Sequence, residues 1–155
     1  MSVTASQNQT VTGSARSARV LAARPVWQVG VVAALAGAVV TEVFALVARG
    51  AGVPMEAAGP GAAEAAEIPV GGFAGGVLFW SVVGIVLAMG LARWAKRPGR
   101  TFVVVTVALT ALSLVGPVVA PHTAVSTQIV LAASHVVAAA VVIPPLAIRL
   151  TSARG

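Results

Sequence analysis

The sequence predicts an all-α membrane protein, a four-transmembrane-helix bundle with both termini in the cytoplasm and a disordered N-terminal tail. Of its 155 residues, 58% are hydrophobic and only 9% are charged, whereas soluble domains carry about 25% charged residues. Four apolar stretches have the length of about 20 residues that crosses a bilayer. Most of the basic residues flank these stretches, where topology signals are expected. The length allows one domain.

The polar tail, residues 1–23, has no apolar core and is predicted to be disordered in the cytoplasm. The transmembrane domain follows at residues 24–150, and residues 151–155 form a second cytoplasmic tail. The first span is much longer than the roughly 7–15 apolar residues of a signal peptide, so we expect it to be retained. The predicted spans are residues 26–48, 70–92, 101–120 and 128–148.

The orientation of the spans follows from the basic residues. The link "RWAKRPGR" between the second and third spans holds four of them, and both tails hold others. The links on the other side of the bundle contain Arg49 as their one basic residue, together with Glu56, Glu64 and Glu67. The positive-inside rule therefore places both termini and "RWAKRPGR" in the cytoplasm. This basic turn could alternatively bind lipid or a partner.

The third span is interrupted by Pro117, which a membrane helix tolerates when its neighbours satisfy the freed carbonyl. Thr106, Thr110 and Ser113 precede the proline at spacings that place all four residues on one helix face. We expect the three hydroxyls to bond their own backbone carbonyls or a neighbouring helix, rather than a ligand.

Helices in lipid associate by close packing and interhelical hydrogen bonds, because lipid provides no hydrophobic drive between them. The first span carries small residues on one face and bulky residues on the other, which predicts a packing face and a lipid face. The predicted packing face holds Gly30, Ala34, Gly37, Thr41, Ala45 and Ala48, and the lipid face holds Val32, Val39, Val43 and Leu46. The second span begins "VGGFAGG", which gives two small-xxx-small pairs.

A carboxylate inside the first span, Glu42, is the most unusual residue of the sequence. It lies about 10 Å from the outer boundary at 1.5 Å per residue, and His135 on the fourth span lies at a similar depth. Because an ionised carboxylate is costly in hydrocarbon, Glu42 should be protonated or have a partner. The predicted polar site comprises Glu42, His135, Thr41, Ser113, Gln128 and Ser134.

Intramembrane ionisable residues mark functional sites by default, so a site that binds or moves a small amphipathic molecule or a proton is the first hypothesis. Two structural alternatives remain open. One is a polar clasp that fixes helix register, and the other is a pair of Glu42 with Arg49.

Two further functions are also open: a non-catalytic scaffold or accessory subunit, and an intramembrane enzyme such as an isoprenoid cyclase or isomerase. The residues favour a protein without catalytic activity, since they contain one intramembrane carboxylate and no nucleophile–base pair. No cofactor, metal or nucleic acid is expected, and there is no cysteine. The expected partners are the lipid bilayer and either a second copy of the chain or another membrane protein.

Four stretches resemble an uncharacterised family of small four-span membrane proteins from actinobacteria. They are "TEVFALVARGAGVP" (41–54), "IPVGGFAGG" (68–76), "RPGRTFVVVTVALTALSLVGP" (97–117) and "SHVVAAAVVIP" (134–144). The resemblance covers most of the chain after the tail. It implies a location in the plasma (inner) membrane and brings no known activity.

Overall fold

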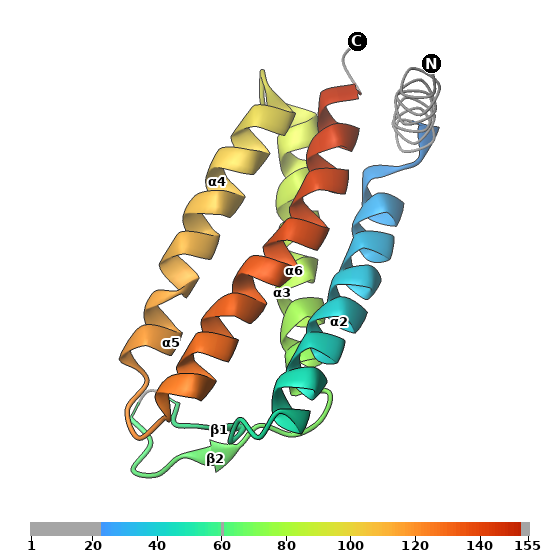
Figure 1. Ribbon diagram of the computed structural model, residues 1–155. Helices are drawn as coiled ribbons and strands as arrows, with labels where there is room; N and C mark the ends of the chain where they lie inside the picture. The colour runs from blue at the N-terminus through green and yellow to red at the C-terminus, as the bar shows by residue number, and fades with distance from the viewer. Residues whose placement is uncertain (1–22, 60, 153–155) are drawn as a thin grey trace, which may run out of the picture.

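The computed structural model describes residues 23–59 and 61–152 (Figure 1). The predicted disordered tail, apart from Ala23, lies outside the described residues. The described chain forms α2 (Val26–Gly50), β1 (Glu56–Ala57), β2 (Ala66–Glu67), α3 (Gly72–Trp94), α4 (Pro98–Ser113), α5 (Val115–Val119) and α6 (Val125–Ser152).

Four of the described helical segments are long enough and apolar enough to cross a membrane: α2, α3, α4 together with α5, and α6. They confirm four long apolar helices where the sequence predicts spans, with every helix end within four residues of the predicted boundary. Helix α6 continues to Ser152, two residues into the predicted C-terminal tail, and the cytoplasmic location of that tail stays a prediction. The hydroxyls of Thr151 and Ser152 bond the carbonyls of Ala147 and Ile148 one turn earlier, which keeps the last turn helical.

The third span breaks at Leu114, between α4 and α5. Pro117 lacks the N–H that would bond the Ser113 carbonyl, and a proline ring clashes with the carbonyl four residues earlier. The chain tightens at the break, where Leu114 N–H bonds the Ala111 carbonyl at 3.3 Å. The predicted interruption of this span is therefore confirmed, one turn before the proline itself.

Helix α6 crosses the bundle between α2 and α4, and α3 packs mainly on α2 (Figure 1). The predicted packing face of α2 is confirmed, because five of its six residues are buried and Ala48 is half-buried. The predicted lipid face is exposed throughout, with Val32 at 67% and Val39 at 63%. Helix α2 is thus held on one face by α3 and α6, and its other face is free for lipid.

Two glycines permit this close packing of α2. A Cβ on Gly37 would lie 2.7 Å from Cγ2 of Val142 on α6 and 3.4 Å from Cγ1 of Val77 on α3. A Cβ on Gly30 would overlap the side chain of Ile85 on α3. The small residues of α2 therefore set how closely three helices approach one another.

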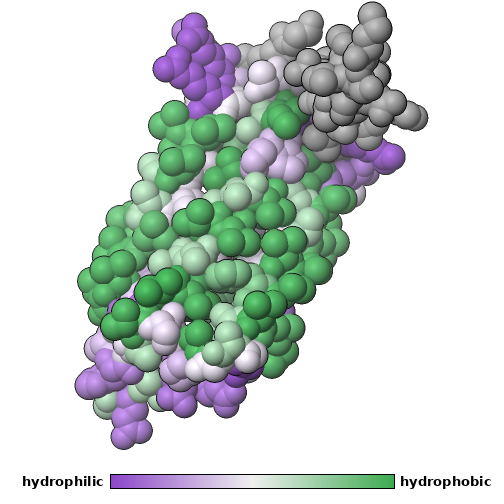
Figure 2. Space-filling view, in the orientation of Figure 1, coloured by the Kyte–Doolittle hydropathy of each residue, from purple (hydrophilic) through white to green (hydrophobic). Residues whose placement is uncertain are grey.

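The surface of the bundle is a broad hydrophobic band with hydrophilic residues at its two ends (Figure 2). One end, called the basic end here, holds the α3–α4 turn and the last turn of α6. The other, called the acidic end, holds the strands β1 and β2 and carries Glu56, Glu64 and Glu67. This distribution, with four apolar helices, is that of a multi-pass membrane protein.

Substituting Gly37 by alanine should destabilise the bundle by about 1–3 kcal/mol, because an added methyl group at this position overpacks the contact with Val142. Denaturant unfolding in detergent micelles measures the change. Gly84→Ala is the matched control: its Cβ would meet nothing within 4 Å, so it should be neutral or slightly stabilising. Equal losses in both variants would contradict this role of Gly37.

Candidate functional site

The Glu42 carboxylate of α2 binds the first turn of α3. Its Oε1 accepts a hydrogen bond from the Gly71 N–H at 2.7 Å, and its Oε2 accepts one from the Ala74 N–H at 2.9 Å. The Glu42 side chain is half-buried against the start of that helix. The partner that an intramembrane carboxylate requires is therefore the backbone of the next span.

Helix α3 needs this partner because its own sequence supplies no cap. The first N–H groups of a helix have no intrahelical acceptor, and a Ser or Thr at the N-cap with a Glu or Gln three residues later usually satisfies two of them. In α3 the N-cap is Gly71 and the third helical residue is Ala74, neither of which has a polar side chain. Glu42 makes both bonds of this capping box from another helix, and its charge also suits the positive end of the helix dipole.

The turn before α3 presents these N–H groups. Gly72 N–H bonds the Pro69 carbonyl at 2.9 Å, and Gly71 between them has φ 88° and ψ −9°. These angles match the third position of a type II turn, which glycine adopts without strain. The sequence "PVGG" therefore aims the start of α3 at α2.

A second contact between α2 and this segment lies two helical turns further along, at Arg49. Its guanidinium forms an ion pair with Glu67 at 3.1 Å and donates to the Ile68 carbonyl at 2.5 Å. Arg49 thus pairs with Glu67, and Glu42 with the α3 backbone, in place of the Glu42–Arg49 pair considered from the sequence. Together the two residues hold the chain from Glu67 to Ala74 along α2, and we call this arrangement the α2–α3 clasp.

The remaining predicted site residues make local contacts. His135 Nδ1 lies 2.7 Å from the Leu131 carbonyl of its own helix. The hydroxyls of Ser134 and Ser113 donate to carbonyls three residues earlier, at 2.6 and 2.7 Å. Gln128 Nε2 donates to the Ala120 carbonyl at 3.0 Å.

Thr41 is 1% exposed, and its Oγ1 has no hydrogen-bond partner in the described part of the chain. Neither a hydrogen bond nor an ion pair joins Glu42 to His135 in the described structure. The structure thus joins Glu42 to α3, leaves Thr41 without a hydrogen-bond partner among the described residues, and leaves the other four predicted residues in separate contacts.

The hydroxyls of the third span bond their own helix, as expected. Thr106 donates to the Phe102 carbonyl at 2.7 Å, and Thr110 donates to the Thr106 carbonyl at 2.8 Å. Such bonds leave no hydroxyl hydrogen for a ligand.

The loop between α2 and α3 folds over the acidic end of the bundle, and the sequence analysis missed the residues that hold it there. The hydroxyl of Thr127, a fully buried residue, bonds the Pro54 carbonyl, and Thr123 Oγ1 accepts from the Ala58 N–H at 3.2 Å. Met55 is buried with Phe73 and Val130 beneath the loop. No periodic pattern marks such contacts, because they join a loop to a distant helix end.

Replacing Glu42 by glutamine should lower the free energy of unfolding by about 1.5–3 kcal/mol, the worth of a hydrogen bond to a charged group. The amide keeps one acceptor for α3, but its NH₂ group faces the other N–H. Unfolding in detergent micelles measures the loss.

Glu64→Gln is the matched control, because it removes a carboxylate from an exposed loop position and should leave stability unchanged. A Glu42→Gln protein as stable as the wild type would contradict the capping role. That result would instead favour a functional carboxylate.

The described residues contain no group of three or more His, Cys, Asp or Glu side chains that could hold a metal ion.

The model of a family of unknown function, DUF6069, matches residues 21–152 of the chain. No curated protein and no solved structure matched the chain. Because the match covers all of the described helices, the chain belongs to the DUF6069 family of unknown function.

Proposed function

We propose that the protein is a non-catalytic scaffold or accessory subunit of the plasma membrane, with four spans and both termini in the cytoplasm. The observation that carries this proposal is the double hydrogen bond from Glu42 to the start of α3. A carboxylate that carries protons has to become neutral during each cycle. Protonation of Glu42 would weaken its bonds to two N–H groups of a helix terminus, which is costly in a lipid environment.

The orientation is supported by the separation of charge between the two ends of the bundle. Arg93, Lys96, Arg97 and Arg100 lie around the turn between α3 and α4, and Arg149 lies in the last turn of α6. Three of the four acidic residues lie in the loop at the other end. The positive-inside rule assigns the basic end to the cytoplasm.

The orientation can be tested with single cysteines, because the natural chain has none. Ala63→Cys in the loop of the acidic end should react with a membrane-impermeant maleimide on intact cells. Trp94→Cys at the basic end, which is 82% exposed in the structure, should react only after the cells are permeabilised. The reverse pattern would place the basic end outside.

A surface for a partner helix is supported by uncovered glycines on α3. A Cβ on Gly75 or Gly76 would meet nothing within 4 Å, and Phe79 and Trp80 on the next turn are 66% and 68% exposed. A glycine inside a helix costs about 0.5–1 kcal/mol relative to alanine, and this cost has no compensation on a face that meets only lipid. Small residues at this spacing permit the close approach of another membrane helix, from a second copy or from another protein.

Photo-crosslinking in the native membrane tests this surface. A photoreactive residue at Gly76 should give one discrete product, either of twice the chain's mass or containing one identified membrane protein. The same residue at Val39, which is 63% exposed on α2, is the control and should give none. Equal, diffuse labelling at both positions would contradict a partner on α3.

A binding or transport site in the outer half of the membrane is the second candidate function. The observation in its favour is the buried Thr41 hydroxyl, which has no partner among the described residues. This candidate requires the Glu42→Gln protein to fold normally and lose activity, whereas the scaffold proposal expects the destabilisation described above. An intramembrane enzyme would need turnover of a prenyl substrate by the purified protein.

A further inference from the structure

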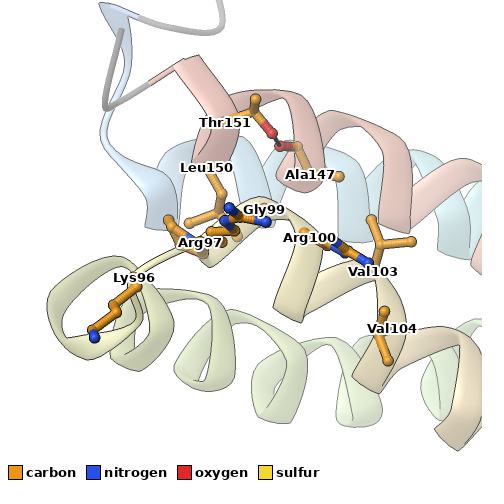
Figure 3. A pocket seen from close by; sticks show the side chains of 10 residues that line it. Lys96, Arg97, Gly99, Arg100, Val103, Val104, Ala147, Leu150 and Thr151 are labelled. Atoms are coloured by element: carbon orange, nitrogen blue, oxygen red, sulfur yellow. Dashed lines mark hydrogen bonds between the residues drawn. The ribbon is translucent and has the colours of Figure 1, made fainter.

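A groove of about 570 Å³ opens at the basic end of the bundle, between the start of α4 and the last turns of α6 (Figure 3). Its apolar part is formed by valines of α4 and by small or apolar residues of α6. The lining residues used here are Arg97, Arg100, Val103, Val104, Ala147 and Leu150.

The close contact of α4 with α6 shapes this groove. A Cβ on Gly99 would overlap the Thr151 hydroxyl and lie 3.1 Å from the Ala147 carbonyl, so the two helices nearly touch at this point. Leu150 is fully buried beside the contact. The Thr151 hydroxyl is occupied by the Ala147 carbonyl at 2.8 Å (Figure 3), so this wall is largely apolar.

The charge of the groove is concentrated at its mouth. Arg97 is the N-cap of α4 and Arg100 lies in its first turn, and both residues line the groove. Both residues are exposed. The chain has four carboxylate side chains, at positions 42–67, and all belong to α2 or to the loop at the acidic end. No side-chain carboxylate of the protein therefore neutralises these arginines.

The start of α4 adds to this positive potential. Its N-cap is Arg97, which makes no side-chain cap, and Pro98 begins the helix. The positive end of the helix dipole therefore faces the same region as the two guanidinium groups. Along α4 the surface changes within one turn from arginine to the exposed valines Val103 and Val104.

We propose that this groove binds one anionic phospholipid. Its phosphate would lie between Arg97 and Arg100, and one acyl chain would follow Val103 and Val104 along the seam with α6. The order of charge and apolar surface matches that of a lipid in its leaflet, because the groove begins at the hydrophilic end and continues toward the hydrophobic band (Figures 2 and 3). Basic pockets between spans at the cytoplasmic side bind anionic headgroups in the same way.

The apolar part of the groove favours a phospholipid over a soluble phosphate compound or an acidic protein segment. A soluble phosphate would leave the valine surface uncovered, and an acidic peptide has no acyl chain to lie along that surface. The inference requires a membrane-embedded protein and goes beyond the scaffold proposal, since it is carried by the groove alone.

Titration of the full chain in detergent by native mass spectrometry tests the proposal. Dioleoyl phosphatidylglycerol should bind at least fivefold more tightly than the phosphatidylcholine with the same chains. Arg97→Gln combined with Arg100→Gln should weaken phosphatidylglycerol binding about tenfold or more, because each basic residue near an anionic surface contributes about 1 kcal/mol.

Two matched controls separate the groove from general charge and from misfolding. Arg93→Gln removes an exposed arginine of α3 that does not line the groove, and it should change the affinity by less than twofold. Val104→Trp should block the position of the acyl chain and weaken binding without loss of charge, whereas Leu112→Trp, at a similarly exposed position of α4, should not.

Three outcomes would overturn the inference. Equal affinity for the two lipids would show that charge is not recognised. An effect of Arg93→Gln as large as that of the double variant would show only diffuse attraction. Inorganic phosphate that competes as well as phosphatidylglycerol at equal concentration would assign the arginines to a soluble anion.

Discussion

The fold depends on one carboxylate that caps a helix from outside it. The first N–H groups of a helix have no acceptor within its own turn. Helix α3 begins beside Glu42, which lies about 12 Å from the end of α2 at 1.5 Å per residue. The two hydrogen bonds from Glu42 hold the start of α3 against α2, where the turn "PVGG" presents its N–H groups. The charge and the helix terminus are each costly alone and compensate when joined.

Most other polar side chains of the four helices also bond backbone groups. Threonine and serine hydroxyls of α4 and α6 bond the carbonyls one turn before them, and the His135 ring contacts its own helix. Association of the helices therefore rests mainly on shape. Gly37 of α2 lies close to α6, and Gly99 of α4 lies close to the other end of α6. This distribution makes α6 the common packing partner of α2 and α4, and it leaves much of α3 uncovered.

The two ends of the bundle have different structures, and the difference bears on function. At the acidic end a loop is tied down by Arg49, Thr123 and Thr127 and buries Met55 beneath it. At the basic end the connection from α3 to α4 is short, and a groove lined by two arginines lies open. A folded cover at one end and an open, charged groove at the other fit a protein that meets lipid headgroups or partners at its basic end.

The sequence by itself determined the four spans, the break before Pro117, the packing face of α2 and the local bonding of the third-span hydroxyls. These features depend on composition, helical period and the chemistry of single turns, and all of them are local properties of the chain. The orientation also follows from the sequence and stays a prediction.

Only the tertiary structure decided the partner of Glu42, because residue spacing gives the depth of a side chain along its own helix but not the rotation or tilt of its neighbours. His135 lies at the same predicted depth as Glu42 and yet contacts its own helix. The start of α3 is brought to Glu42 by a loop, and the path of a loop cannot be predicted from sequence periodicity. The missing capping box at Gly71 and Ala74 was the one sequence signal of that arrangement, since an uncapped helix start in an apolar chain requires an acceptor from elsewhere.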